Sequence, residues 1–182
     1  LNTRWKATPE HPLKLYYGDL DGNGIIDMIE ARYDSNMQKE VPLRILKTVG
    51  PALPFVQEKM QTFAAYGNAS VQEIYGDLLK KTEVLEVTTL SSMLFLNRGT
   101  NFEARPLPPE VQFSPAFGIS VGDLDGDGNE DVLLTQNIFA INPEMPRADA
   151  GRGLILLGDG KGNLTAVPGQ LSGIKVYGEQ RG

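Results

Sequence analysis

Two short stretches of the chain carry acidic side chains on alternate positions, and the more acidic of them, 122–131, reads GDLDGDGNED. Ca²⁺ takes about six to eight oxygen ligands at roughly 2.3–2.6 Å, and alternate carboxylates of one tight loop can all turn inward. The intervening glycines reach backbone angles that other residues adopt only at a cost. Because carboxylates this close repel one another, the spacing predicts a metal site. The expected ligands are four aspartate side chains and one backbone carbonyl, from Asp123, Asp125, Asp127, Asn129 and Asp131.

The stretch 18–27, GDLDGNGIID, repeats this pattern. Here an amide oxygen replaces one carboxylate, and ligand charge tunes calcium affinity. We therefore expect two Ca²⁺ sites, of which the Asp123 loop is the stronger. The expected ligands of the first loop are Asp19, Asp21, Asn23, Ile25 and Asp27.

The composition excludes several classes of protein. The chain of 182 residues has a net charge of −6 and no basic stripe interleaved with aromatic residues, which argues against nucleic-acid binding. Cysteine is absent, so disulfides and thiolate metal sites are excluded. No apolar run approaches the roughly 20 residues that a membrane-spanning helix requires. The length is that of one domain with a sizeable core.

Apolar runs of strand length flank both acidic loops, at 13–17 and 25–33 and again at 117–121 and 132–135. Further along, 92–104 and 154–166 each read as a strand, a Gly/Asn/Asp turn and a second strand, which is a β-hairpin signal. The sequence thus predicts a single mainly β region of four-stranded antiparallel units. The expected bounds are about 13–107 for the first unit, about 113–168 for the second, and 173–182 for the opening strand of a third.

Between the second and third expected strands of the first unit, the pattern changes to a helical one. Pro54 can begin a helix and Gly67 can end it. Ser70 and Glu73 have the spacing of a capping box ahead of a second amphipathic segment. We therefore expect a two-helix hairpin inserted at about 49–81. The second unit has a smaller insertion, 138–153, at the corresponding point.

Four-stranded units with D-x-D-G-[DN]-G-x-x-D loops resemble the FG-GAP/VCBS repeats, the blades of integrin-α-like β-propellers. The Phe117-Gly118 pair also fits this pattern, and 107–115 with 147–150 looks like bacterial secreted VCBS-repeat proteins. The resemblance implies propeller blades with structural calcium loops. Because a closed propeller needs about four to eight blades, we expect the chain to be a fragment whose parent supplies the rest. The matching loop positions are Asp19, Asp21, Asn23, Asp27, Asp123, Asp125, Asp127 and Asp131.

Two other interpretations of the acidic loops remain open. The stretch 19–30 also matches an EF-hand or dockerin loop, although Pro12 and the run after it make a poor entering helix. The second loop has Glu130 and Leu134 where an EF-hand needs an apolar residue and a bidentate glutamate. A propeller-type polysaccharide-processing enzyme is the other alternative. The acidic residues crowd one turn and His11 stands alone, so we expect no active site in this chain.

The expected function is therefore a calcium-binding, non-catalytic β-propeller module that binds or scaffolds an extracellular protein or glycan. In such a blade the insertions emerge opposite the calcium loops, and this face is the expected partner surface. The alternative is that the helices only cover a sheet face or an exposed edge. Calcium modules of the extracellular type bind at about 10⁻⁴–10⁻³ M, which favours a secreted, periplasmic or cell-surface location. The candidate partner-binding residues are Asn137, Asn142, Arg147 and Asp149.

Overall fold

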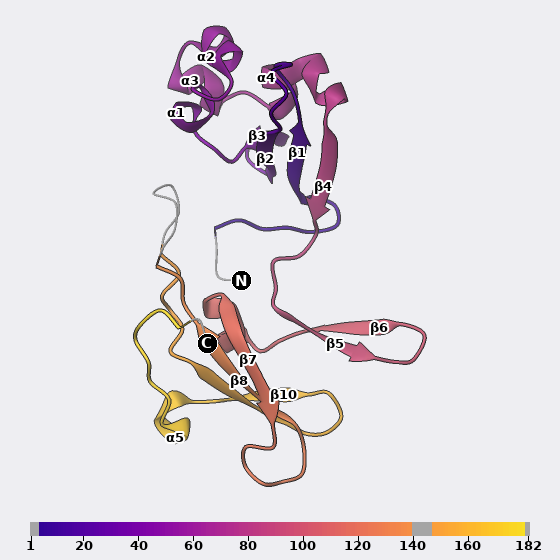
Figure 1. The fold of residues 1–182 in the computed structure, drawn as a ribbon, viewed down its shortest axis with the longest axis vertical. Helices are drawn as coiled ribbons and strands as arrows, with labels where there is room; N and C mark the ends of the chain where they lie inside the picture. Colours follow the sequence, from indigo (N-terminus) through magenta and orange to yellow (C-terminus); the bar gives the residue numbers. More distant parts are fainter. Residues whose placement is uncertain (1–3, 140–146, 181–182) are drawn as a thin grey trace. The chain divides into compact units, whose positions relative to one another are not determined.

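The structure, a computed structural model, describes residues 4–139 and 147–180. The chain divides into two compact units (Figure 1). The N-terminal unit is Arg4–Leu90, and the described part of the C-terminal unit begins at Ser91. Both units contain an antiparallel four-stranded sheet, which confirms the mainly β class, although the expected single region is divided in two. Within the described ranges, no helix is long and apolar enough to cross a membrane.

The sheet of the N-terminal unit has the strand order β3-β2-β1-β4. β1 and β2 pair from Lys14 opposite Ala31 to Gly18 opposite Asp27, so the first acidic loop joins two adjacent strands, as expected. β4 pairs with the other side of β1 and forms one edge of the sheet. The strands are β1 (Leu13–Gly18), β2 (Asp27–Asp34), β3 (Lys39–Pro42) and β4 (Glu83–Val87).

Short helices between β3 and β4 supply most of the core of this unit. Val56 of α2 and Ile74 of α4 are buried together with Ile29 and Ala31 of β2. Leu20, from the first acidic loop, is buried in the same cluster. The helical elements are α1 (Leu46–Val49), α2 (Pro54–Met60), α3 (Phe63–Gly67), α4 (Val71–Tyr75) and the 3₁₀-helix η1 (Gly76–Lys81).

The helical insertion differs from the expected two-helix hairpin at 49–81. The helix predicted to start at Pro54 ends at Met60, and Gln61 adopts a φ of 51°. Thr62 then begins α3, because its side chain accepts the Ala65 N–H. The capping box of Ser70 and Glu73 is confirmed at the start of α4. The insertion follows β3 and not the second strand, because the short strand Lys39–Pro42 precedes it.

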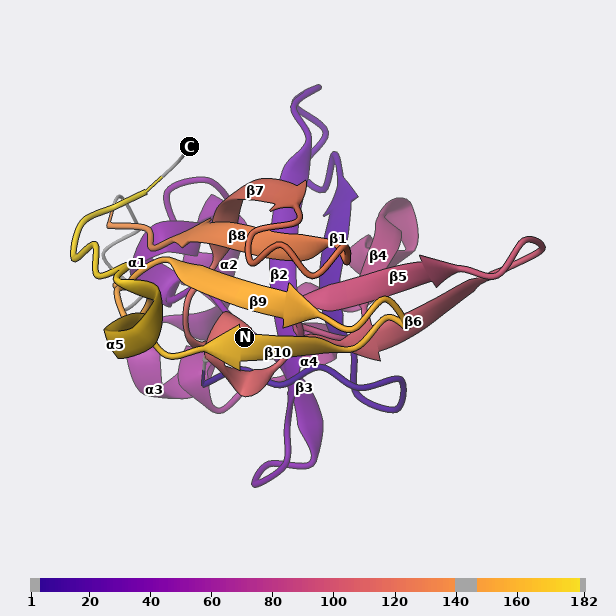
Figure 2. The same cartoon turned by 90° about the horizontal axis from the view of Figure 1, so that it is seen from below.

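The C-terminal unit contains a four-stranded meander of order β10-β9-β8-β7 (Figure 2). The second acidic loop joins β7 to β8, with Gly122 opposite Asp131. The core on one side of this sheet is formed by Val111, Leu134, Leu154 and Leu156. The elements are η2 (Pro109–Phe113), β7 (Ala116–Gly122), β8 (Asp131–Gln136), β9 (Leu154–Gly158), β10 (Leu164–Val167) and α5 (Gly169–Ser172).

The hairpin of β5 (Met93–Asn97) and β6 (Phe102–Pro106), expected as the last two strands of the first unit, forms a separate two-stranded sheet. It belongs to the C-terminal unit. The reason is that β3 and β4 already occupy the outer sides of β2 and β1, so the first sheet is complete without the hairpin.

The strand expected at 173–182 is not observed over 173–180, and the remaining residues lie outside the described part. Gly173, with a φ of 78°, ends α5. The tail is then held by single backbone bonds, from Val176 N–H to the Arg152 carbonyl and from Gln180 N–H to the Gln136 carbonyl.

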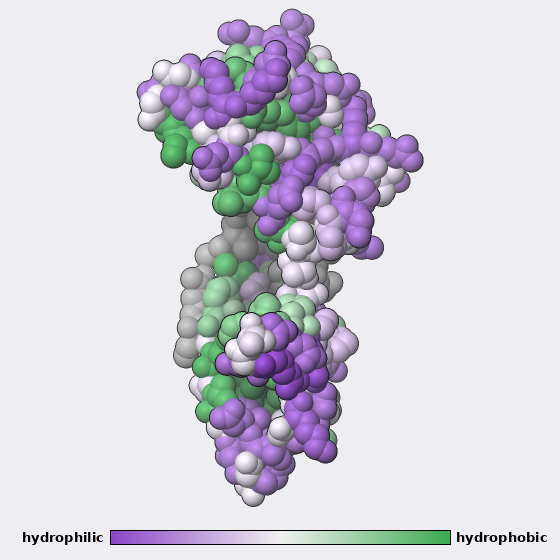
Figure 3. Space-filling view, turned by 90° about the vertical axis from the view of Figure 1, so that its right-hand side faces the viewer, coloured by the Kyte–Doolittle hydropathy of each residue, from purple (hydrophilic) through white to green (hydrophobic). Residues whose placement is uncertain are grey.

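Hydrophobic side chains remain at the surface of both units (Figure 3). On β7 the exposed side chains are Phe117, Ile119 and Val121. Ile119 pairs with Leu134 of β8, which is buried. The apolar side chains on this face of the sheet are therefore buried on β8 and exposed to solvent on β7. On the N-terminal unit, β4 exposes Leu85 and Val87.

Candidate metal centres

The second acidic loop is held in shape by its own backbone N–H groups. Asp123 accepts the Gly126 N–H on Oδ1 at 2.7 Å and the Gly128 N–H on Oδ2 at 3.0 Å. Both glycines have a φ near +80°, at 83° and 84°, which a residue with a side chain adopts at a cost. Asp131 closes the loop, since its Oδ2 accepts the Leu124 N–H at 2.8 Å.

The first loop has the same internal bonds at the matching positions. Asp19 accepts the Gly22 N–H on Oδ1 at 2.7 Å and the Gly24 N–H on Oδ2 at 2.9 Å. Asp27 accepts the Leu20 N–H at 3.0 Å. The two loops that repeat in the sequence therefore also share the same pattern of aspartate-to-backbone hydrogen bonds.

Three carboxylates converge in each loop, with ligand oxygens that all lie within 4.8 Å of one another. Asp127 is not part of the converging group, and its carboxylate accepts the backbone and side-chain N–H groups of Asn129 at 2.7 and 2.8 Å. In the first loop, Asn23 donates its side-chain amide to Asp21 at 2.9 Å and accepts the Ile25 N–H at 2.8 Å. The converging groups are Asp19, Asp21 and Asp27, and Asp123, Asp125 and Asp131.

The backbone donors also favour the ionised form of two of these carboxylates. The Gly24 N–H is the main cause that lowers the pKa of Asp19, with further bonds from Gly22 and Asn23. The N–H groups of Gly158 and then Leu124 lower the pKa of Asp131. Ionised carboxylates are the ligands that a hard divalent cation requires.

The turn between β9 and β10, at 158–163, contacts the second acidic loop. This turn was not part of the site predicted from the sequence. The Gly158 N–H donates to Oδ1 of Asp131 at 2.9 Å, and the Asp131 side chain is fully buried. A Cβ on Gly158 would lie 2.1 Å from the Glu130 carbonyl oxygen, and one on Gly160 would lie 2.4 Å from Oδ1 of Asn129. The alternating glycines of GDGKG at 158–162 are the sequence feature that could have indicated a close contact of this turn with its neighbours.

The donor sets fit a hard cation. Each converging group consists of oxygen donors alone, and in the second group the Gly158 N–H also holds the Asp131 carboxylate. Two acidic clusters in the described chain can therefore hold a metal ion.

Of the described residues expected to bind a partner, one is buried and two are exposed. Asn137 is fully buried, and its amide donates to the carbonyls of Gly151 and Gly178 at 2.8 and 3.0 Å. Arg147 and Asp149 are exposed, with 3.7 Å between the guanidinium and the carboxylate, and the guanidinium lies 4.1 Å from the ring centroid of Phe139. Asn142 lies outside the described residues. Asn137 is thus a structural residue, because its polar atoms fix a loop and the chain end.

Comparison of the chain with protein-family models, with curated proteins and with solved structures found no match. The interpretation of the two loops consequently rests on their geometry and on the chemistry of their side chains.

Proposed function

We propose that the chain is a calcium-stabilised, non-catalytic β module in which each metal loop fastens a pair of antiparallel strands. The observation that carries this proposal is the repetition of one loop, with the same aspartate-to-backbone bonds, between β1 and β2 and between β7 and β8. Such carboxylates repel one another without a cation, so binding stabilises the folded loop relative to the unfolded chain.

Calcium suits these loops better than magnesium does. Both loops offer converging carboxylate oxygens from one irregular turn, which matches the irregular oxygen shell of Ca²⁺. Mg²⁺ demands near-ideal octahedral geometry and usually retains several waters. Asp123, Asp125 and Asp131 would hold the ion in the second loop, and Asp19, Asp21 and Asp27 in the first.

The strand–loop–strand setting supports a relation to FG-GAP/VCBS blades more than to an EF-hand, in which helices flank the loop. In this proposal the four-stranded meander β7–β10 is a blade and the rest of the propeller comes from a parent chain. The exposed Arg147 and Asp149 are the candidate contacts for an extracellular protein or glycan. Loops with calcium affinities of the extracellular type, about 10⁻⁴–10⁻³ M, would be nearly empty in the cytosol, so this proposal includes a secreted, periplasmic or cell-surface location.

Chelation and titration test calcium binding directly. We expect isothermal titration of the chelator-treated protein to detect two sites, and about 2 mM Ca²⁺ to add about 0.6–1.8 kcal/mol per site to the free energy of unfolding if Kd lies at 10⁻⁴–10⁻³ M. The double variant D123N/D125N should lose one of the two sites. D77N is the matched control, because Asp77 is an exposed residue of η1 paired with Lys80.

An absence of calcium heat in the unmodified protein, with a melting temperature that chelator does not change, would contradict this function. Loss of binding in D77N equal to that in D123N/D125N would show that net charge, and not the loop, attracts the ion.

A further inference from the structure

The turn between β9 and β10 contacts both the second metal loop and the β5–β6 hairpin, and glycines of the turn lie at both contacts. Gly158 and Gly160 face the second metal loop, where added Cβ atoms would lie 2.1 Å from the Glu130 carbonyl and 2.4 Å from Oδ1 of Asn129. Gly162 faces the β5–β6 hairpin, where a Cβ would lie 2.6 Å from Cδ1 of Leu96. A side chain at Gly158 would meet the backbone and push the turn away from the loop, whereas side chains at Gly160 and Gly162 would displace the Asn129 and Leu96 side chains.

On the loop side, the turn fixes a metal ligand. The Gly158 N–H donates to Oδ1 of Asp131, while Oδ2 of the same carboxylate accepts the Leu124 N–H. The Asp131 side chain is thereby fully buried, whereas its counterpart Asp27 in the first loop is only half-buried. The second loop therefore has an outer support for its last ligand that lies 27 residues further along the chain.

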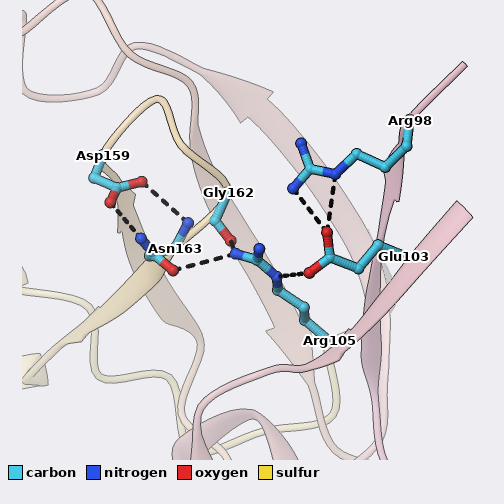
Figure 4. Close-up of polar contacts among 6 residues, drawn as sticks. All are labelled: Arg98, Glu103, Arg105, Asp159, Gly162 and Asn163. Atoms are coloured by element: carbon cyan, nitrogen blue, oxygen red, sulfur yellow. Dashed lines mark hydrogen bonds and ion pairs between the residues drawn. The ribbon is translucent and has the colours of Figure 1, made fainter.

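On the hairpin side, one arginine joins the turn to β6 (Figure 4). Nη1 of Arg105 approaches Oδ1 of Asn163 at 3.3 Å and the Gly162 carbonyl at 3.5 Å. Glu103 holds the same guanidinium through Nε at 2.6 Å, and Arg98 binds the other oxygen of Glu103 at 2.9 Å. Figure 4 shows these ion pairs and hydrogen bonds, which run from Arg98 and Glu103 of the hairpin through Arg105 to the turn.

Within the turn, hydrogen bonds to the Asp159 carboxylate hold Lys161 and Asn163 in place. Its Oδ1 accepts the N–H groups of Lys161 and Asn163 at 2.8 and 3.0 Å, and its Oδ2 accepts the side-chain amide of Asn163 at 2.5 Å. The side-chain bond from Asn163 is the main cause that lowers the pKa of Asp159 to about 2. The same Asn163 side chain thus contacts both Asp159 and Arg105.

A cavity of about 520 Å³ lies between the hairpin, the sheet and the metal loop. Its apolar lining includes Leu94 and Leu96 from the hairpin and Val132 from the sheet, and its polar lining includes Asn129 and Asp159. The hairpin is held against the sheet beside this cavity through the turn, by the Leu96 and Arg105 contacts.

We propose that the turn Gly158–Asn163 is a positioning element of the second calcium loop and couples occupancy of that loop to packing of the β5–β6 hairpin. This inference rests on the proposed calcium binding. Outer partners of metal ligands typically change affinity by about 10–100-fold when they are lost. Because linkage is reciprocal, a calcium ion that tightens the hairpin must bind less tightly when the hairpin is released.

The first test separates the loops by nuclear magnetic resonance during a calcium titration. The amides of Gly126 and Gly128 report on the second loop, and those of Gly22 and Gly24 report on the first. We expect G160A to raise Kd at the second loop by about 10–100-fold and to leave the first loop unchanged. G173A is the matched control, because Gly173 shares the left-handed backbone, with a φ of 78° against 67°, has open space around it, and lies after α5, outside the hairpin and the metal loop.

The second test uses R105Q, which leaves the loop and the turn backbone intact. We expect calcium to slow amide hydrogen exchange in β5 and β6 of the unmodified protein and to have less effect in R105Q. By reciprocity, R105Q should also raise Kd at the second loop.

The outcomes distinguish the inference from the proposed function. If neither loop of the unmodified protein shifts with calcium, calcium binding and the coupling both fail. If the second loop binds calcium normally in both G160A and R105Q, the coupling is wrong while calcium binding stands. A rise in Kd at the second loop in G173A as large as that in G160A would assign the effect to general destabilisation and overturn the coupling.

Discussion

Glu73 connects the start of α4 to the edge strand β3 through one carboxylate. It accepts the Ser70 N–H at 2.6 Å at the start of α4, and it pairs with Lys39 of β3 at 2.9 Å. The Ser70 N–H, followed by Lys39, lowers its pKa from 4.5 to about 2. The helix start and the sheet edge are thus joined by a group that stays ionised in the folded state across most of the acidic range.

This lowered pKa predicts a pH-dependent stability. A carboxyl group whose pKa falls on folding stabilises the protein above its unfolded pKa, and the contribution disappears as pH falls from about 5 to about 2. We expect E73Q to melt at a lower temperature than the unmodified protein at pH 7 and the difference to vanish near pH 2. E58Q, at an exposed position of α2, is the control. A difference that persists unchanged at pH 2 would contradict the assignment.

Among the secondary-structure elements, the break between α2 and α3 shows where sequence reasoning failed. The apolar spacing from Pro54 to Gly67 favours one continuous helix, but the chain turns at Gln61 with a φ of 51°. Thr62 can cap a new helix from its own side chain, and this local bond competes with helix continuation. The break places Val56 and Tyr66 in one core, which is a tertiary requirement that periodicity does not contain.

The strained residue at this break predicts a stabilising substitution. Gln61 has a backbone conformation that costs about 1–3 kcal/mol for a residue with a Cβ. We expect Q61G to raise the free energy of unfolding by about 0.5–1 kcal/mol, because relief of strain exceeds the extra entropy of glycine in the unfolded chain. Q57G, inside α2, is the control and should destabilise by about 1 kcal/mol. Denaturant unfolding measures both, and destabilisation by Q61G would refute the strain argument.

The metal loops were predictable because their information is local. Alternate aspartates and glycines within ten residues specify the turn, its backbone bonds and the converging carboxylates. The strands β3 and β4 were missed because their sequences, KEVP and EVLEV, carry charges and little alternation. The contact of Gly158 with Asp131 could not be predicted, since it depends on how β9 pairs with β8.

Across the whole molecule, the two units differ in how much apolar surface they bury. The N-terminal core draws on the sheet, the first acidic loop and the helices α1–α4. Among the described residues, the buried members of the C-terminal core are Val111, Leu134, Leu154 and Leu156, while Ile119 and Val121 of β7 remain 66% and 60% exposed. Since burial of apolar area is the main stabilising contribution, the C-terminal unit should be the less stable of the two.

Calorimetry with and without calcium tests this asymmetry. We expect two transitions, and the lower one should shift more with calcium, because the second loop carries the stronger charge set and belongs to the weaker core. L156A should lower only the first transition to melt and I74A only the second, since each removes a buried side chain worth about 2–5 kcal/mol from one unit. A single transition lowered equally by both variants would mean that the units unfold together. Calcium would then stabilise the whole chain and not one sheet, because cooperative unfolding distributes binding energy over every element that melts with the site.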